Sequence, residues 1–299
     1  MSQPPDAPEP TATSRSNFNL PLKTTGGTQV WTDFRFRSGY RVQQNALTKH
    51  FRLLDAENVR RAWGNKEQCL AELERRVPKP DAGAAKTHVI LVHGLMRTAG
   101  SMKTLEQKLI EAGNVSSVRF SYASTRGSVE SHAAALREVL EDLPPNDQFQ
   151  FVGHSMGNIV VRALVADLQQ SGDPQGLLPR CERMVMLGPP NQGAAIARRL
   201  SKTKVFGWVT GQGAMELGPE WKKLEANLAT PPFPFHIIAG DIQSPIPNPL
   251  VDGESDFVVS LEEAKLEGSE TFETYPVLHS FLMDDSKIID RVLELLSRS

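Results

Sequence analysis

The 299-residue chain has only two cysteines, Cys69 and Cys181, and a formal net charge of only −2. Two thiols are too few for a disulfide framework, so we expect two separate, reduced cysteines. A charge balance this close to zero gives no reason to expect nucleic acid as a partner. No apolar run approaches the ~18 residues that span a bilayer, so a peripheral contact is the most membrane interaction the sequence allows.

The chain also lacks the short motifs of several cofactor-dependent chemistries. It has no G-x-x-x-x-G-K-[ST] phosphate loop, no H-E-x-x-H pair and no Cys/His cluster, so we expect neither a cofactor nor a metal. Residues 1–27 are rich in Pro, Ser and Thr and have neither a basic start nor an apolar segment. We therefore predict a disordered tail over residues 1–27, no secretory signal and a cytoplasmic location.

Residues 28–299 are predicted to form a single α/β domain. Residues 31–54 alternate apolar and polar side chains, which indicates an antiparallel pair of strands, and residues 66–77 are predicted to form a helix. From residue 89 onward, short apolar runs alternate with amphipathic stretches, such as the one that places Met102, Leu105, Leu109 and Ile110 on a single helix face. This alternation predicts a mostly parallel sheet with helices on both faces.

One segment, residues 194–234, breaks this alternation. It contains two helical stretches around a Gly- and aromatic-rich piece at residues 205–209. One interpretation is an ordinary excursion that covers the sheet. The other is a cap or lid whose apolar face touches the substrate.

The pentapeptide Gly153-His154-Ser155-Met156-Gly157 lies between a predicted buried strand and an apolar helical stretch. A G-x-S-x-G sequence in this setting is typical of a nucleophile elbow, a strained strand-to-helix turn that exposes a serine. The following helix directs its N-terminal N–H groups at negative charge that forms beside Ser155. We predict that Ser155 is a nucleophile.

A serine hydroxyl needs a histidine base, and elbow hydrolases place this base downstream of the serine in the chain. Only His236 and His279 follow Ser155. His236 falls within a predicted buried strand, where a core histidine is expected. His279 follows the last predicted strand, where a loop presents an imidazole at the carboxyl edge of the sheet, so we predict His279 as the base.

The orienting acid has three candidates after the strand at residues 235–239. Asp256 precedes an apolar run, Phe257-Val258-Val259, that would fix its backbone, so Asp256 is the predicted acid. Asp241 follows the strand directly and is suited to capping the turn, whereas Asp252 precedes a glycine and is typical of a turn. Either of these aspartates remains an alternative to Asp256.

A tetrahedral intermediate also needs two N–H donors at its oxyanion. The residue after the nucleophile, Met156, is predicted to supply one donor. Leu95 is predicted to supply the other, because it lies in the loop after the first buried parallel strand and Gly94 allows close backbone approach. His93 in this loop is predicted to brace it.

Together these residues resemble the α/β-hydrolase superfamily, in particular its lipase-like serine esterases. The resemblance covers about residues 40–296, and the segments 189–193 and 215–221 are also similar to ones that these lipases carry. It implies an eight-stranded, mostly parallel sheet and hydrolysis of a carboxylic ester through an acyl-enzyme on Ser155. In this family the acid is often followed by Gly, whereas Phe257 follows Asp256 here.

The single-glycine loop at His93-Gly94-Leu95 resembles the lipase type of oxyanion loop, which favours a small-molecule or lipid ester with a hydrophobic acyl group. Thioesterases, amidases and acyltransferases use the same triad, so these activities remain alternatives. The remaining alternative belongs to a different functional class: a protein with this fold that binds a partner or ligand and has no catalytic activity.

Overall fold

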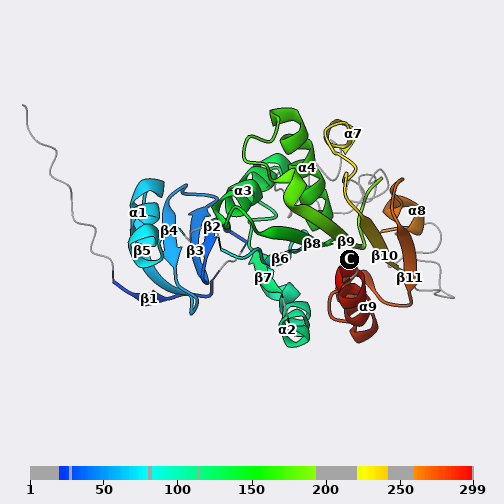
Figure 1. Cartoon of the computed structure of the whole chain (residues 1–299), viewed down its shortest axis with the longest axis horizontal. Coiled ribbons are helices and arrows are strands. Elements are labelled where there is room, and N and C mark those ends of the chain that lie inside the picture. Colours follow the sequence, from blue (N-terminus) through cyan, green and yellow to red (C-terminus); the bar gives the residue numbers. More distant parts are fainter. Residues whose placement is uncertain are drawn as a thin grey trace, which may run out of the picture.

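A computed structural model describes residues 20–26, 29–79, 83–113, 115–192, 221–241 and 259–297. Most of the predicted tail, 1–27, lies outside the described residues, as does most of the predicted cap, 194–234. The domain boundaries therefore stay predictions. The described strands form two sheets, and helices flank the second of them (Figure 1).

The first sheet is antiparallel and comes from the N-terminal part of the chain. Its order is β1-β5-β4-β3-β2, and its strands are β1 Leu22–Lys23, β2 Trp31–Arg37, β3 Tyr40–Asn45, β4 Phe51–Leu54 and β5 Val59–Gly64. The predicted antiparallel pair over residues 31–54 is thus confirmed, and further strands extend it. Helix α1, Lys66–Arg76, starts at a capping box on Asn65 and packs Cys69 and Leu73 against this sheet.

The second sheet is parallel throughout and has six strands. Its order is β11-β10-β9-β8-β6-β7, and its strands are β6 Thr87–Val92, β7 Ser116–Phe120, β8 Gln148–His154, β9 Cys181–Leu187, β10 Phe235–Gly240 and β11 Thr271–Tyr275. The mostly parallel sheet predicted from sequence is confirmed. The count of eight strands is not, because the antiparallel strands of the described residues form a sheet of their own.

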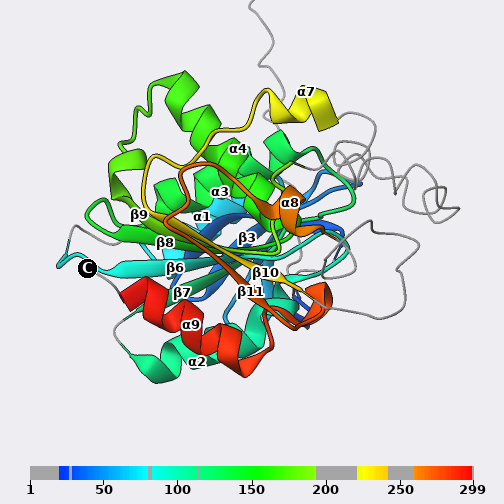
Figure 2. The ribbon, with the colours of Figure 1, turned by 90° about the vertical axis from the view of Figure 1, so that its right-hand side faces the viewer.

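Helices cover both faces of the parallel sheet, which Figure 2 shows from its β11 edge. Helices α3 and α4 lie on one face and α2 and α9 on the other, with the bounds α2 Lys103–Ala112, α3 Val129–Asp142, α4 Met156–Ser171 and α9 Ser286–Ser297. Successive side chains of a strand point to opposite faces, so Ile90 packs toward α3 and α4 while Val89 and Leu91 pack toward α2 and α9. Each such side chain contributes about 1.5–3 kcal/mol on full burial.

The helix α2 differs from its predicted face at one position. Met102, Leu105 and Leu109 are buried as predicted, but Ile110 is 59% exposed. Ile110 follows Leu109 directly and is therefore turned by about 100° around the helix axis, away from the sheet. The prediction that Ile110 belongs to the buried face is wrong.

The two sheets meet through α3 and the end of β7. The backbone N–H of Asp33 donates to the Ser121 carbonyl, and the Ser121 N–H donates to the Asp33 carboxylate, both over 2.8 Å. Arg37 of β2 forms a bidentate ion pair with Asp142 at the end of α3, with distances of 2.9 and 2.7 Å. These contacts attach the antiparallel sheet without adding its strands to the parallel ladder.

The remaining described elements are short. They are α7 Trp221–Glu225, α8 Leu261–Ala264 and the 3₁₀ turns η1 Ala99–Met102, η2 Leu178–Arg180 and η4 His279–Phe281. Among the described helices, none has the length and apolar character that a bilayer crossing requires. Cys69 and Cys181 are separate, buried free thiols, as predicted.

Candidate active site

The predicted nucleophile lies in a strained turn between β8 and α4. Ser155 has φ 51° and ψ −122°, outside the regions that L-residues ordinarily adopt. Its backbone N–H donates to the Leu187 carbonyl of the neighbouring strand, which holds the turn against the sheet. Strain of this kind persists only where the surroundings fix it, and it is typical of functional sites.

The two flanking glycines make this turn sterically feasible. A Cβ atom on Gly157 would lie 2.1 Å from the Val92 carbonyl oxygen, and one on Gly153 would lie 2.3 Å from the Asn158 side-chain oxygen. Both distances are far below van der Waals contact. The G-x-S-x-G spacing is therefore a packing requirement of the turn, as the sequence pattern indicated.

The loop that follows β6 lies directly on the elbow. A Cβ atom on Gly94 would lie 3.1 Å from the Ser155 Cβ and 2.9 Å from the His154 Nδ1. The structure thus brings the predicted oxyanion residue Leu95, which follows Gly94, to the nucleophile. Met156 is the first residue of α4, so its N–H has no acceptor within the helix.

His279 lies beside the same elbow. It begins the turn η4 after β11, is 6% exposed, and its ring centroid is 4.8 Å from that of His154. A Cβ atom on Gly188, at the end of β9, would lie 2.8 Å from the His279 Nδ1. Chain segments that are far apart in sequence therefore bring the predicted base next to His154, the residue that precedes the predicted nucleophile.

His154 holds the backbone of the predicted base. Its Nε2 lies 3.0 Å from the His279 carbonyl oxygen, and since a carbonyl only accepts, Nε2 carries the proton and donates. Burial is the main reason that the pKa of His154 lies well below its usual value. His154 is thus a neutral ring that anchors His279 through its main chain.

Of the three candidate acids, Asp241 alone falls within the described residues. It follows β10 directly, and its backbone N–H donates to the Tyr275 carbonyl over 2.7 Å. Its Oδ1 is buried and accepts no hydrogen bond from the described residues. Asp256, the predicted acid, and Asp252 lie outside the described residues, so the choice among the three stays a prediction.

The loop histidine His93 is fully buried beneath the oxyanion loop. Its Nδ1 lies 2.9 Å from the Gly94 carbonyl, and its ring stacks on Tyr122 with centroids 4.2 Å apart. Tyr122 in turn donates its hydroxyl to the His93 carbonyl over 2.5 Å. Burial lowers the pKa of His93 to about 4, so the ring is neutral near pH 7 and suits the bracing role predicted for it.

The second downstream histidine, His236, is a core residue as predicted. It lies in β10, is fully buried and pairs its Nδ1 with the Thr271 hydroxyl at 3.1 Å. No cluster of His, Cys, Asp and Glu suited to a metal ion occurs within the described ranges.

Three large apolar residues close in sequence to Leu95 and His279 are exposed at the surface. Met96 is 58% exposed, Phe281 54% and Leu278 38%. Met96 follows Leu95, while Leu278 and Phe281 flank His279. The Arg97 guanidinium donates to the Ser280 carbonyl over 3.3 Å and so links the two loops that carry these residues.

Sequence reasoning missed three residues that hold the site together, namely His154, Asn158 and Gly188. The side-chain amide of Asn158 donates to the Ser155 carbonyl over 3.1 Å and to the Leu187 carbonyl over 3.3 Å. Gly188 adopts a positive φ of 52° that favours glycine. Its position directly before Pro189-Pro190, at the end of a buried run, was the one available signal.

Residues 88–227 match the model of the palmitoyl protein thioesterase family, just under half of the chain. The comparison with curated proteins gave no significant match. Among solved structures, the mature form of the Bacillus licheniformis lipase BlEst2 superimposes with a TM-score of 0.52 at 16% identity, covering 73% of this chain and 94% of the lipase.

The propeptide form of that lipase gives a TM-score of 0.50 at 17% identity and covers 71% of this chain and 51% of its own. A metagenomic carboxyl esterase, MGS0156, gives a TM-score of 0.49 at 16% identity, with 72% and 77% covered. Identities this low describe the fold, and the elbow between β8 and α4 lies where that fold places it. The chain is therefore an α/β-hydrolase by fold, and over residues 88–227 it is similar to the palmitoyl protein thioesterases.

Proposed function

We propose that this protein is a serine hydrolase that cleaves carboxylic esters of hydrophobic acyl groups through an acyl-enzyme on Ser155. The observation that carries the proposal is the strained elbow at Ser155, with the Gly94 loop packed on it and His279 at its side. A buried, neutral His154 beneath His279 supports it, because a fixed base is what nucleophile activation needs.

The proposed reaction begins when the Ser155 hydroxyl attacks the ester carbonyl and gives its proton to His279. The oxyanion of the tetrahedral intermediate accepts hydrogen bonds from the N–H groups of Leu95 and Met156. The intermediate collapses as the carbon–oxygen bond to the alcohol breaks and His279 protonates the departing oxygen. Water, deprotonated by His279, then releases the acid and restores Ser155.

Asp256 is the proposed acid that orients the imidazole of His279. Its exchange for asparagine should lower kcat by a factor on the order of 10³–10⁴ with little loss of stability. Asp241→Asn and Asp252→Asn are the matched controls, and both should stay within about tenfold of the parent chain. If kcat instead falls by a factor of about 10³–10⁴ in one of these controls, that residue and not Asp256 is the orienting acid.

A hydrophobic acyl group is the proposed substrate feature, because the exposed Met96, Leu278 and Phe281 belong to the loops that carry the predicted site residues. The same side chains would meet a lipid surface, so we retain peripheral membrane contact and a cytoplasmic location as predictions. The match over residues 88–227 to a palmitoyl protein thioesterase family favours one second candidate, cleavage of an S-acyl thioester by the same residues. Esters and thioesters of the same acyl chain, compared by kcat/KM, separate the two candidates.

Labelling with a fluorophosphonate tests whether the protein is an enzyme of this class. We expect one label per chain, lost in Ser155→Ala and kept in Ser171→Ala, which alters a serine at the far end of the same helix, α4. A folded parent chain that takes no label would refute the serine-hydrolase proposal and leave the non-catalytic binding module. A label retained in Ser155→Ala would refute the assignment of the nucleophile.

A further inference from the structure

A cavity lies at the edge of the parallel sheet opposite the elbow. It has a volume of about 460 Å³ and is bounded by the starts of β6 and β7, the β2–β3 turn and the ends of α1 and α3. Ser155 follows the carboxyl end of β8, whereas this cavity lies at the amino ends of the parallel strands β6 and β7. The cavity is therefore separate from the proposed catalytic site, and its volume is in the range that small-molecule sites have.

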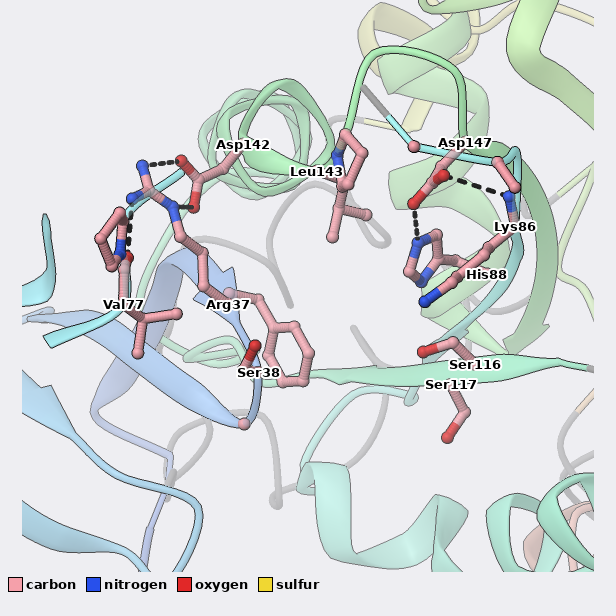
Figure 3. A pocket seen from close by; sticks show the side chains of 16 residues that line it. Arg37, Ser38, Val77, Lys86, His88, Ser116, Ser117, Asp142, Leu143 and Asp147 are labelled. Atoms are coloured by element: carbon pink, nitrogen blue, oxygen red, sulfur yellow. Dashed lines mark hydrogen bonds and ion pairs between the residues drawn. The ribbon is translucent and has the colours of Figure 1, made fainter. Parts of the chain in front are cut away.

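The cavity has two chemically different sides (Figure 3). Lys86, His88 and Ser116 lie together on one side. The apolar residues of the lining are Val77 and Leu143, together with Phe36, Pro78 and Pro144. His88 and Ser116 are register partners in the adjacent parallel strands β6 and β7, which places them next to one another. The Lys86 side thus suits a polar head group, whereas on the other side the apolar Val77 lies beside the Arg37–Asp142 pair, whose charges already satisfy one another.

The acids that line the cavity already have partners. Asp142 is held by Arg37 over 2.9 and 2.7 Å, and Asp147 accepts from His88 over 2.6 Å and from the Lys86 backbone N–H over 3.1 Å. The Asp142 charge is thus paired with the Arg37 cation, and both carboxylates have hydrogen-bond donors within the cavity lining. The Lys86 side chain is exposed and forms no ion pair with the described residues, so its ammonium is available to a ligand anion.

His88 adds a buried polar atom that lacks a partner. The residue is 8% exposed, its Nε2 binds Asp147, and its Nδ1 is buried with no hydrogen bond to the described residues. Figure 3 shows this second nitrogen turned toward the side of the cavity where the Lys86 ammonium lies. A buried nitrogen without a partner costs free energy, and a carboxyl group satisfies it in either state, accepting from a protonated ring or donating to a neutral one.

We propose that this cavity is a binding site for a small amphipathic carboxylic acid. The carboxylate pairs with the Lys86 ammonium and accepts hydrogen bonds from the Ser116 hydroxyl and, when the His88 ring carries protons on both nitrogens, from its Nδ1–H. The apolar body of the ligand packs between Phe36, Val77 and Leu143. The site is independent of Ser155, and its occupation does not require the proposed hydrolysis.

Octanoate is the probe for this site, and two-dimensional amide NMR of the full chain locates where it binds. We expect saturable shifts at residues 36–39, 86–88 and 116–117, with a Kd on the order of 1 mM for so small a ligand. Acetate, which lacks the apolar body, and 1-octanol, which lacks the charge, should each bind at least about fivefold more weakly.

Lys86→Met removes the charge and keeps the apolar stem, so it should weaken octanoate binding about tenfold, the usual effect of losing one charge-assisted bond. Lys222→Met, at an exposed lysine of α7, is the matched control and should bind octanoate as the parent chain does. Shifts confined to residues around 94–97 and 154–157 would overturn the proposal and place octanoate at the proposed catalytic site. Equal binding by Lys86→Met, or equal binding of 1-octanol, would overturn it as well.

Discussion

Two buried histidines should make the folded state sensitive to mild acid. His93 is fully buried and His132 is 3% exposed, and both rings contact Tyr122. Burial lowers the pKa of His93 from 6.5 to about 4. Burial and the neighbouring His93 charge lower the pKa of His132 from 6.5 to about 3.

The sign of the effect follows from which state binds the protons. Below pH 6.5 the unfolded chain protonates both rings, whereas the folded chain keeps them neutral until pH falls to about 4 and about 3. The stability that these rings contribute is therefore complete above pH 6.5 and is lost as pH falls. Each ring contributes a slope of about 1.4 kcal/mol per pH unit, so lowering the pH to 5 costs ~2 kcal/mol per ring and ~4 kcal/mol for both.

Between pH 5 and pH 7.5, ionisable groups other than histidines change the stability less than the buried histidines do. His154 acts in the same direction, since its pKa also lies well below its usual value. Asp33 acts in the opposite direction because burial raises its pKa. The pKa of Glu72 is about 2, held down mainly by hydrogen bonds from Arg75. The stability that Glu72 contributes is therefore lost only at pH values below 4.5.

Urea denaturation at pH 7.5 and at pH 5 measures the effect. We expect the free energy of unfolding to fall by ~4 kcal/mol or more, a large part of the 5–15 kcal/mol of an ordinary domain. His132→Phe should reduce that fall by ~2 kcal/mol, whereas His50→Gln, at a half-exposed histidine whose pKa is also lowered by burial, should reduce it by less. An equal fall in His132→Phe and the parent chain would refute the reasoning.

Three further substitutions test the elbow, its histidine and the contact between the sheets. Gly157→Ala places a Cβ atom 2.1 Å from the Val92 carbonyl oxygen and should cost ~2–3 kcal/mol in thermal unfolding and abolish fluorophosphonate labelling. His154→Phe keeps a buried ring but removes the bond to the backbone of the proposed base, so it should lower kcat about tenfold with KM nearly unchanged, as ester-hydrolysis kinetics would measure. Asp142→Asn breaks the buried pair with Arg37 and should cost ~1.5–3 kcal/mol in urea denaturation.

Matched controls accompany these substitutions. Gly100→Ala adds the same methyl group where the nearest atom is a side-chain oxygen 3.3 Å away, so it should cost less than ~1 kcal/mol. Glu141→Gln breaks a more exposed pair with Arg137 and should cost no more than ~1 kcal/mol. A cost for Gly157→Ala as small as that of Gly100→Ala, or an unchanged kcat in His154→Phe, would contradict the packing described for the elbow.

The parallel sheet was readable from the sequence because its signal is local. Continuous apolar runs such as residues 89–92 occur where a strand is covered on both faces, and the two cores that receive their side chains confirm this. The full antiparallel sheet was not readable. In β4 the sequence Phe51-Arg52-Leu53-Leu54 lacks alternation, since Arg52 is itself buried, with its guanidinium bonded to Gln43 and placed over the Trp31 ring.

The candidate site likewise has a part that local sequence predicts and a part that depends on long-range contacts. The elbow was predictable because its glycines meet atoms of β6 and α4 that the motif brings together in every such turn. The bond from His154 to the His279 carbonyl joins residues 125 positions apart, and no local pattern encodes it. The acid depends on a loop position, for which the sequence offered three aspartates and no spacing rule to separate them.

The proposed nucleophile and base are held by different kinds of interaction, and this bears on how the site is maintained. Ser155 lies in a strained turn that the packing of the buried β8 and α4 holds in place. Only a change that reaches the centre of the sheet therefore releases it. His279 depends on the short turn η4, which Leu282 and Met283 anchor in the core beneath α9, and on the bond that His154 donates to its backbone carbonyl. Since β11 at this edge is only partly buried, loosening there moves the base before it affects the elbow. The bond from His154 therefore ties the less firmly held base to the rigid elbow, which is a physical reason for a neutral, buried histidine beside the proposed nucleophile.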